Sequence, residues 1–454
     1  MALVSSTAFC PALFIAAPSS GQGKTTVTAA MARLFRRQGY KVRVFKTGPD
    51  YLDPQILEQA SGNPVEPLDL WMAGEAFCRQ ALYAAAVNSD LILIEGAMGL
   101  FDGEPSSADL AVTFGVPVAL LMDVKGMAQT AAAIAVGLAG YRDDVQIAGL
   151  IANGCGTERH AQLIREALPD DLPLLATLGR DDAVALPERH LGLVQPSEVE
   201  TEIEERLERG ADWLQASGLT RLPEAVAFSP VALALQEDRL KAYANTKDVL
   251  QGKTIAVARD AAFTFIYRAN LELLEHFGAE VVFFSPLSES SLPDADVLWL
   301  PGGYPELHVE QLSANGRMRD AIQAFYQSGK LILAECGGFM YCLDHLVDLS
   351  GQSFPMLGLL SGEAVMRNKG GCQGMQTAPL PEGDVRGHSH HRSLSRSTPE
   401  PLAYGRRQRH PAPGESVYRQ QGLTASYLHL FFPSNPEAIA RLFGSMPEAW
   451  RILS

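Results

Sequence analysis

A glycine-rich turn near the N-terminus places the strongest constraint on how this chain folds. It follows the apolar run 13–17 and precedes a helical pattern of apolar residues that starts at Val27. In a phosphate loop of this kind, backbone N–H groups face the phosphates, a lysine reaches the β- and γ-phosphates, and the next hydroxyl ligates Mg²⁺. Pro18 replaces the first glycine of the usual pattern, and an ordinary strand-to-helix turn is the alternative. The predicted phosphate-binding residues are Gly21, Gly23, Lys24, Thr25 and Thr26.

Length and charge limit the classes of protein to which the chain belongs. Its 454 residues exceed what one hydrophobic core usually holds, so two domains are expected. The net charge of −15 argues against a nucleic-acid or anionic-membrane surface, since both partners are negatively charged. A polyanionic small molecule would therefore have to bind in a locally basic pocket. The oligomeric state stays open, with a homodimer as one candidate.

The cysteines and the N-terminus indicate the compartment. Six scattered cysteines without a CxxC pair favour reduced thiols over a disulfide framework. The apolar N-terminus lacks the basic region of a secretory signal, and no apolar stretch approaches the ~20 residues that a membrane span needs. We expect a cytoplasmic protein.

Apolar strand-like runs alternate with helical segments from residue 11 to about 195, which is typical of a parallel sheet covered on both faces. The expected strands are 13–17, 41–46, 91–95, 118–123 and 147–153, and the expected helices are 27–38, 75–87 and 129–138. The alternation restarts with strands at 254–259, 280–284, 297–300 and 331–335. The fold class is therefore α/β, with a phosphate-loop parallel-sheet domain followed by a second α/β domain.

The predicted domains are 10–220 and 252–454, joined by a linker at 221–251. The glutamate-rich run 200–208 is expected to be a solvated helix face. The Pro- and Ser-rich stretch 386–413 is the strongest candidate for an irregular segment, either a mobile loop near a ligand or an exposed loop.

Acidic residues follow two of the predicted strands of the first domain. Asp50 and Asp53 lie in and after a Gly-Pro turn, and Glu95 ends the apolar run 91–95. Since the carboxyl ends of parallel strands bind ligands, Lys24, Asp50 and Glu95 are expected to converge there, with Thr25, Glu95 and Asp50 as Mg²⁺ ligands. Alternatively, the two aspartates only cap turns.

A cysteine follows a buried strand in the second domain. Cys336 precedes two glycines and a helical start, the arrangement of a nucleophile elbow, in which the helix N-terminus is expected to lower the pKa of the thiol. A buried structural cysteine is the alternative. His429, near the C-terminus, is the expected base, although it could equally be a core histidine.

The motif RGHSHHRS forms a local cluster of positive and titratable side chains in an acidic protein. It contains Arg386, His388, His390, His391 and Arg392. Alternatively, the motif is a solvated loop, or its three histidines bind Zn²⁺.

The first domain resembles the cobyrinate and hydrogenobyrinate a,c-diamide synthases, which are relatives of dethiobiotin synthetase. The segments that carry the resemblance are APSSGQGKTTVTAA, FKTGPDYLDP, IEGAMGLFDG, DVKGMAQTAAA and LPERHLGLV. The resemblance implies an ATP-binding amidoligase that phosphorylates a substrate carboxylate, after which ammonia displaces the phosphate. It assigns ATP and Mg²⁺ to Lys24, Thr25, Thr26 and Glu95, and the tetrapyrrole to Asp50, Tyr51 and Leu52.

The second domain is similar to a class I glutamine amidotransferase of the corrinoid-amidase subtype. PGGYPELH resembles the oxyanion loop, with Gly302 and Gly303 as N–H donors; AECGGFMY carries Cys336 and YLHLFF carries His429. Phe431 stands where many such domains have a triad glutamate, and the corrinoid subtype lacks that acid too. Related enzymes have RGHEFHYS where this chain has RGHSHHRS, which favours substrate contacts by Arg386 and Arg392.

Together these resemblances imply an ATP- and glutamine-dependent amidase acting on two carboxylates of a corrin-type macrocycle in cobalamin biosynthesis. Its small-molecule partners would be ATP with Mg²⁺, glutamine and the tetrapyrrole. The alternatives are the same chemistry on another tetrapyrrole such as nickel sirohydrochlorin, on later carboxylates of the pathway, or a partitioning or regulatory ATPase. Cys336 with PGGYPELH argues against the last, because a nucleotide switch needs no thiol nucleophile.

Overall fold

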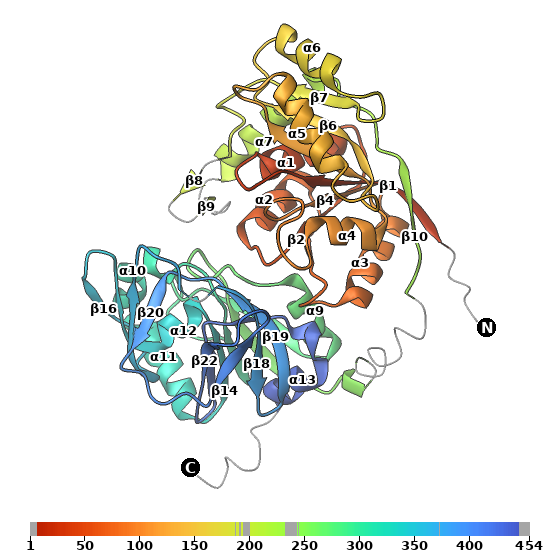
Figure 1. Cartoon of the computed structure of the whole chain (residues 1–454). Helices are drawn as coiled ribbons and strands as arrows, with labels where there is room; N and C mark the ends of the chain where they lie inside the picture. Colours follow the sequence, from red (N-terminus) through yellow and green to blue (C-terminus); the bar gives the residue numbers. More distant parts are fainter. Residues whose placement is uncertain are drawn as a thin grey trace, which may run out of the picture. The chain divides into compact units, whose positions relative to one another are not determined.

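The computed structural model shows two compact units, Met1–Leu235 and Gln236–Ser454 (Figure 1). It describes residues 7–186, 188–189, 192–193, 200–231, 243, 245–371 and 373–444. Parts of the LPERHLGLV motif, together with Cys372, lie outside this set. No helix within the described ranges is long and apolar enough to cross a membrane.

The first unit is built on one central sheet with the strand order β3-β2-β4-β1-β5-β6-β7. All neighbours on this path are parallel. The strands are β1 (Ala8–Ala16), β2 (Val42–Thr47), β3 (Glu66–Leu68), β4 (Leu91–Glu95), β5 (Val118–Asp123), β6 (Ile147–Asn153) and β7 (Leu174–Leu178). A short antiparallel pair, β8 (Glu188–Arg189) and β9 (Gly192–Leu193), follows β7 in the chain. The order reverses at β1, so the loop after β1 lies at a topological switch point, where open α/β sheets bind ligands.

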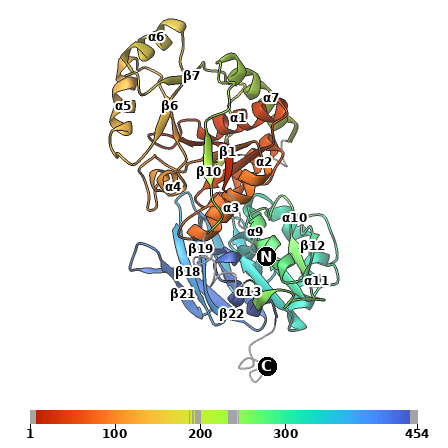
Figure 2. The ribbon, with the colours of Figure 1, turned by 90° about the vertical axis from the view of Figure 1, so that its right-hand side faces the viewer.

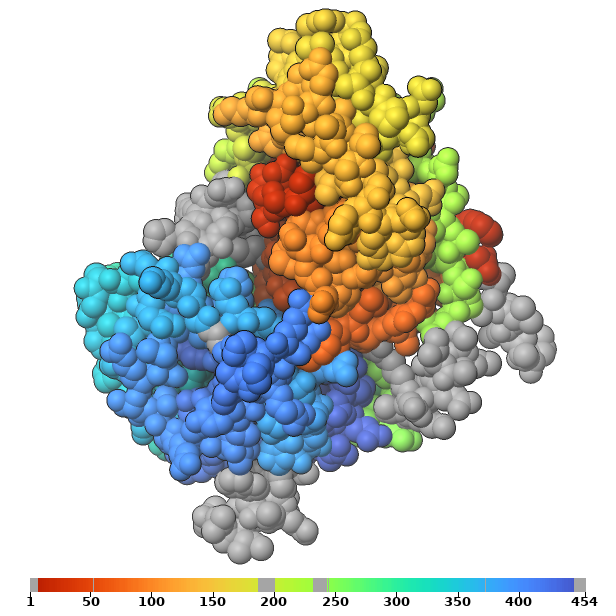
Figure 3. All heavy atoms as spheres, viewed as in Figure 1, coloured from red at the N-terminus to blue at the C-terminus, as the bar shows by residue number. Residues whose placement is uncertain are grey.

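Helices cover the sheet of the first unit. They are α1 (Lys24–Arg37), α2 (Leu52–Ser61), α3 (Glu75–Asn88), α4 (Ser107–Phe114), α5 (Gln129–Ala139), α6 (Glu158–Ala167) and α7 (Glu200–Ala216). Apolar residues of α1, α2 and α7 form one core with residues of β1, β2 and β4. Helices α5 and α6 lie side by side next to β6 and β7 in both views (Figure 2). Part of the red N-terminal segment, which includes the phosphate loop, reaches the surface among orange segments of the same unit (Figure 3).

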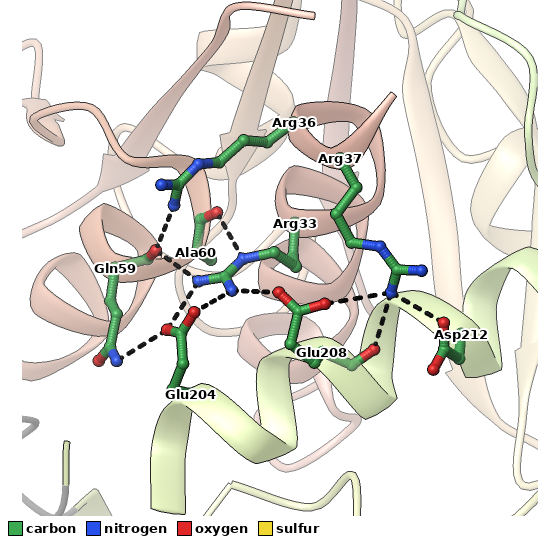
Figure 4. Close-up of polar contacts among 8 residues, drawn as sticks. All are labelled: Arg33, Arg36, Arg37, Gln59, Ala60, Glu204, Glu208 and Asp212. Atoms are coloured by element: carbon green, nitrogen blue, oxygen red, sulfur yellow. Dashed lines mark hydrogen bonds and ion pairs between the residues drawn. The ribbon is translucent and has the colours of Figure 1, made fainter. Parts of the chain in front are cut away.

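The glutamate-rich run belongs to α7, and the expectation of a purely solvated helix face is wrong. Arg33 of α1 is 3% exposed and forms ion pairs with Glu204 and with Glu208, the latter at 2.5 Å from Nη1 to Oε1 (Figure 4). Arg37 pairs with Asp212 at 2.8 Å. The glutamates remain about half exposed, but they neutralise a buried guanidinium and fix α7 against α1.

The second unit contains a ten-stranded mixed sheet with the order β12-β11-β13-β14-β23-β22-β21-β18-β19-β24. The first five strands are parallel, and the rest pair antiparallel. The strands are β11 (Thr254–Ala258), β12 (Glu280–Phe284), β13 (Val297–Leu300), β14 (Leu331–Glu335), β18 (Gly374–Leu380), β19 (Gly383–Ser389), β21 (Ala403–Arg407), β22 (Pro413–Gln420), β23 (Leu423–Ser426) and β24 (His429–Leu430).

A smaller sheet and several helices complete the second unit. The sheet has the order β16-β15-β17-β20, with β15 (Leu343–Val347), β16 (Ser353–Pro355), β17 (Leu360–Met366) and β20 (Ser393–Arg396). The α-helices are α9 (Arg268–His276), α10 (Val309–Ala314), α11 (Gly316–Gln327), α12 (Gly337–Cys342) and α13 (Pro436–Gly444). Two short 3₁₀ turns are η2 (Pro305–Leu307) and η3 (Phe432–Ser434).

The expected α/β class is confirmed, and each strand predicted from the sequence is present. Their ends lie within two residues of the expected ones, except that β1 begins at Ala8, five residues before the expected start at Leu13. The stretch 386–413 is not irregular: it contributes to β19, β20, β21 and β22. Composition misled there because pairing with distant strands such as β17 and β18 outweighs the local preference of Pro and Ser for loops. Within 221–251, strand β10 (Ala225–Phe228) pairs antiparallel with β1 of the first sheet.

Candidate functional site

Two glycines shape the phosphate loop between β1 and α1. Gly21 and Gly23 have φ of +76° and +93°, in the left-handed region that favours glycine. A Cβ at Gly23 would lie 2.7 Å from Nδ2 of Asn153, which donates to the Gln22 carbonyl at 3.0 Å. The Gln22 side chain accepts the backbone N–H of Asp123 at 2.8 Å. The loop is thereby tied to the carboxyl ends of β5 and β6.

Lys24 is the first residue of α1 and is 8% exposed. Its ammonium donates to the backbone carbonyls of Ser19 at 3.2 Å and Met98 at 2.8 Å. Burial, together with the nearby Lys46 ammonium, lowers its pKa. Both partners are neutral carbonyls, so the lysine contacts no carboxylate that a phosphate would have to displace.

Thr25 meets the predicted acid at the end of β4. Its hydroxyl donates to Oε1 of Glu95 at 2.8 Å, and Glu95 is fully buried. The same oxygen lies 2.6 Å from Nζ of Lys46, which is also buried and which pairs with Asp53 at 2.7 Å. Lys46 was not predicted as a site residue. The sequence signal for Lys46 is its position at the end of an apolar strand, close to a Gly-Pro turn.

The protonation of this cluster follows from burial and from Lys46. Burial raises the pKa of Glu95, although Lys46 opposes the shift. Burial also raises the pKa of Asp50 to about 7, and the neighbouring Asp53 carboxylate adds to it. Burial disfavours ionisation of Asp53 too, but the Lys46 ammonium outweighs it and keeps the Asp53 pKa below its usual value. Near neutral pH Asp53 is therefore the ionised member of the pair, and Asp50 holds a proton part of the time.

Two residues, Thr25 at the start of α1 and Glu95 at the end of β4, fit a divalent cation. Oε2 of Glu95 is buried and has no hydrogen-bond partner among the described residues, while Oε1 holds Thr25 and Lys46. Mg²⁺ is usually held by one or two protein oxygens, with the remaining positions taken by phosphates and water. Thr25 and the vacant oxygen of Glu95 match that requirement. Asp50 instead accepts the backbone N–H of Asp53 at 3.2 Å, as its alternative role of a turn cap predicts.

The remaining predicted residues of this site lie around the same loops. Thr26 is half-buried on α1, and Tyr51 is half-buried at the start of α2. The side chain of Leu52 lies outside the described part of the chain.

The predicted nucleophile elbow joins β14 and α12. Cys336 has φ +44° and ψ −100°, a strained backbone for a non-glycine residue, and its N–H donates to the Ser426 carbonyl at 2.8 Å. A Cβ at Gly337 would lie 2.9 Å from the Gly303 nitrogen, and one at Gly338 would overlap the Leu300 carbonyl. Only glycines allow the elbow to approach the loop after β13 this closely.

Gly302 lies between the thiol and the histidine. A Cβ at Gly302 would lie 3.3 Å from Cβ of Cys336 and 2.8 Å from Nδ1 of His429, and would overlap the imidazole Cε1. The cysteine and the histidine therefore both pack against Gly302. His429 also stacks on His388 at a centroid distance of 5.0 Å, and Phe265 lies 5.8 Å away.

Burial sets the protonation of this pair. It raises the pKa of the Cys336 thiol well above its usual value, and the Glu306 and Glu415 carboxylates add to the shift. It lowers the pKa of His429 well below its usual value, with His388 adding to the shift. The expected lowering of the thiol pKa is thus wrong for the resting protein, because α12 has only six residues and burial dominates. The resting pair is a thiol and a neutral imidazole that can accept its proton.

A cavity of about 490 Å³ opens beside the elbow, within the second unit. His391, Glu415 and Tyr427 line it, and the imidazole stacks on the Tyr427 ring at a centroid distance of 3.8 Å. Nε2 of His391 lies 2.8 Å from Oε1 of Glu415. Tyr427 also contacts Phe339 of α12 at a ring-centroid distance of 4.9 Å, so the network lies next to the helix of the elbow.

Two protein families match consecutive parts of the chain. Residues 13–194 match the CobQ/CobB/MinD/ParA nucleotide binding domain, and residues 254–437 match the CobB/CobQ-like glutamine amidotransferase domain. A hydrogenobyrinate a,c-diamide synthase of Stutzerimonas stutzeri is 51% identical over 95% of this chain and 98% of that protein. The chain belongs to the a,c-diamide synthase family.

Further relatives support the same assignment. The chain is 50% identical to a hydrogenobyrinate a,c-diamide synthase of Pseudomonas aeruginosa, over 97% of this chain and 99% of that protein. It is 47% identical to a cobyrinate a,c-diamide synthase of Herminiimonas arsenicoxydans, over 98% and 99% of the two chains. The predicted family is confirmed, with a nucleotide-binding domain and an amidotransferase domain in one chain.

The histidine-rich motif of this synthase is not the cationic cluster that its sequence suggests. Burial lowers the pKa of His388 to about 3, and His391 bonds to Glu415, so the motif's exposed charge rests on its arginines. Arg386 is exposed on β19, and Arg392 is half-buried before β20. Among the described residues, no group of three His, Cys, Asp or Glu could hold a metal ion, so the Zn²⁺ alternative gains no support.

Sequence reasoning missed Glu415 and Arg367, which line the cavity of the second unit. No local signal marks Glu415, because its partner His391 lies 24 residues away in the segment between β19 and β20. Arg367 follows β17 and donates to the Ser393 carbonyl at 3.3 Å. The place of Glu415 and Arg367 in the cavity is apparent only from the fold, in which β17, β20 and β22 lie close together.

Proposed function

We propose that this synthase amidates the a- and c-side-chain carboxylates of cobyrinate or hydrogenobyrinate in cobalamin biosynthesis, using ATP, Mg²⁺ and the amide nitrogen of glutamine. The near full-length match to a,c-diamide synthases carries this proposal. Each unit contains one of the two sites that the reaction needs, a phosphate loop and a cysteine elbow. We place the reaction in the cytoplasm, where a reducing environment keeps free thiols such as the five described cysteines reduced.

In the first unit, the proposed reaction is phosphorylation of a substrate carboxylate by ATP. Lys24 would exchange its two backbone carbonyl partners for phosphate oxygens, and the N-terminus of α1 would supply N–H donors. Thr25 and Glu95 would hold Mg²⁺, which supplies charge neutralisation at the phosphates. Lys46, fixed by Glu95 and Asp53, adds a buried positive charge beside the position of the developing acyl phosphate.

In the second unit, the proposed reaction is hydrolysis of glutamine. His429 takes the thiol proton, and the Cys336 sulfur attacks the carboxamide carbon. Backbone N–H groups of Gly302 and Gly303 stabilise the resulting oxyanion. His429 returns the proton to the leaving nitrogen, so ammonia departs and a thioester remains. Water then releases glutamate and restores the thiol.

The cavity beside the elbow suits the amino-acid end of glutamine. Its volume of about 490 Å³ lies in the usual range for small-ligand sites. Glu415 offers a carboxylate for the α-ammonium group, and Arg367 offers a guanidinium for the α-carboxylate. These opposite charges match a zwitterion better than they match the polyanionic macrocycle.

For the macrocycle, Arg386 and Arg392 remain the proposed carboxylate-binding residues of the second unit. Within the first unit, Asp50, Tyr51 and Leu52 remain the residues proposed to face the tetrapyrrole. Guanidinium groups pair with carboxylates in a bidentate way, and Arg386 is exposed to solvent. Replacing either arginine by alanine should raise the KM for the macrocycle and leave the constants for ATP and glutamine unchanged.

The substrate is identified by mass spectrometry of the products. The protein is incubated with ATP, Mg²⁺, glutamine and, in turn, cobyrinate, hydrogenobyrinate and nickel sirohydrochlorin. The proposal predicts a product with two carboxylates converted to amides from at least one of the first two compounds. Diamide formation from nickel sirohydrochlorin alone would overturn the choice of substrate, and absence of any amide would overturn the proposed reaction.

A further inference from the structure

The histidine of the elbow site lacks the acid that usually follows it by two residues. Phe431 occupies that position and is fully buried. His429 must nevertheless face Cys336 in a fixed orientation, because proton transfer requires a defined geometry. The ring is stacked on His388, but stacking leaves the position of its backbone to other groups.

A buried carboxyl group holds the backbone next to His429. Glu335, the last residue of β14, is 2% exposed. Its Oε1 accepts the backbone N–H of Leu430 at 2.7 Å, and its Oε2 accepts the indole N–H of Trp299 at 2.8 Å. Trp299 is itself fully buried on β13. Both oxygens are therefore engaged by donors whose positions are fixed by the sheet.

The position of Glu335 in the chain links the base to the nucleophile. Glu335 directly precedes Cys336 in the chain, and Leu430 directly follows His429. One hydrogen bond, from Leu430 to Glu335, thus connects the two reacting residues through their immediate neighbours. Because successive side chains of a strand point to opposite faces, Glu335 can hold Leu430 without entering the thiol site.

A second buried side chain completes the support. Asn270, 1% exposed, donates to the Leu430 carbonyl at 2.8 Å and accepts the N–H of Phe432 at 2.8 Å. Asn270 fixes the segment after His429, and Glu335 connects that segment to the elbow strand.

We propose that Glu335 is a positioning residue for the glutaminase reaction, which sets the orientation of His429 toward Cys336 through the Leu430 backbone and replaces the triad acid that Phe431 displaces. The inference rests on the proposed function, since it assigns a role in glutamine hydrolysis. Burial raises the pKa of Glu335 to about 8, so hydrophobic packing alone would not favour a carboxyl group here.

The test replaces Glu335 by glutamine. A carboxamide fits the same space, but its NH₂ group cannot accept a hydrogen bond, so only one of the two donors keeps its partner. We expect the glutaminase kcat of Glu335→Gln to fall on the order of 100-fold, as for a small misplacement of a reacting group. KM for glutamine and the ammonium-dependent synthesis rate should stay near wild type. The rate of Cys336 alkylation by iodoacetamide should fall with kcat.

Glu382→Gln is the matched control. Glu382 is another buried carboxylate of the second unit and is paired with Arg419. Among the described residues it has no hydrogen bond to the segment 429–432. Loss of the ion pair between Glu382 and Arg419 should lower Tm, whereas kcat for glutamine should stay at the wild-type value. Should Glu335→Gln be insoluble, Glu335→Asp, whose shorter carboxylate cannot reach both donors, should show the same selective loss to a smaller extent.

The outcomes separate the two proposals. A wild-type glutaminase rate in the soluble Glu335 variant would overturn the positioning role. If kcat fell in proportion to Tm in both the Glu335 and the Glu382 variants, Glu335 would be only a structural residue. Failure of the wild-type protein to release glutamate from glutamine would contradict the proposed function itself, independently of both variants.

Discussion

Lys46 and Glu95 form a buried ion pair at the carboxyl ends of the neighbouring strands β2 and β4, with 2.6 Å between Nζ and Oε1. Glu95 is fully buried, and its other oxygen, the proposed Mg²⁺ ligand, has no hydrogen-bond partner among the described residues. The pair therefore joins the stability of the first unit to its proposed phosphoryl chemistry.

Lys46→Met should lower both the stability of the first unit and the rate of amide synthesis. Removing one partner leaves a buried carboxyl group without its counter-charge, which typically costs about 3–5 kcal/mol of the free energy of unfolding. We expect a lower Tm and a loss of synthesis with either glutamine or ammonium, while glutamine hydrolysis persists. Lys41→Met, at an exposed lysine just before the same strand, is the control and should leave both unchanged. Undiminished synthesis by the Lys46 variant would show that the pair is structural only.

Lys24→Ala should separate the two half-reactions without a large effect on stability. Within the described part of the chain, the hydrogen-bond partners of the ammonium are two backbone carbonyls, so its loss leaves no carboxylate without its ion-pair partner. Synthesis from glutamine and from ammonium should fall together, since both require phosphorylation of the substrate carboxylate. Assays of ADP release and glutamate release in parallel measure this. Normal ammonium-dependent turnover would refute the role of the phosphate loop.

Gly302→Ala should disable the thiol site by steric overlap. The added methyl group would collide with the His429 ring and approach Cβ of Cys336 to 3.3 Å. Glutaminase kcat should fall on the order of 100-fold because the reacting groups are displaced. Gly316→Ala, at a position with no atom within 4 Å of the added carbon, is the matched control in the same unit. Equal rates for the two variants would contradict the placement of His429.

His388 should make the second unit sensitive to acid. Burial, reinforced by His390, lowers its pKa to about 3 in the folded protein, against about 6.5 when unfolded. The unfolded chain therefore binds the extra proton between these values, and stability falls as the pH drops below about 6.5. Thermal unfolding of wild type and His388→Asn at about pH 7.5 and about pH 5 measures this. The wild type should lose more Tm than the variant; an equal loss would place the acid sensitivity elsewhere.

Part of the first site was accessible from the sequence because its residues lie within short motifs at strand ends. Thr25 and Glu95 meet as the carboxyl-end rule predicts, since β1 and β4 are neighbours in the sheet. Lys46 was not predicted as a site residue, although it stands four residues before Asp50. Its contact with Glu95 depends on the pairing of β2 with β4, which no local pattern specifies.

For the second site, the residues named from the sequence lie close together around Gly302, but their electrostatics were not foreseen. Glycines around Cys336 identify an elbow, yet only the fold reveals that burial opposes ionisation of the thiol. The network of His391 and Glu415 joins β22 to the segment before β20, so it has no signature in either stretch alone. Glu335 could have been suspected by the argument applied to Glu95, an acid that ends a buried strand.

The most direct test of two linked sites in one chain is amide formation by Cys336→Ala with different nitrogen sources. Diamide product is measured by mass spectrometry with ATP, Mg²⁺ and either glutamine or an ammonium salt, alongside wild type. The account predicts that the variant forms no product from glutamine and forms it from ammonium at the wild-type rate, because the first unit keeps its phosphate loop. Glutamine-dependent product from the variant, or loss of the ammonium-dependent reaction in a folded variant, would contradict it.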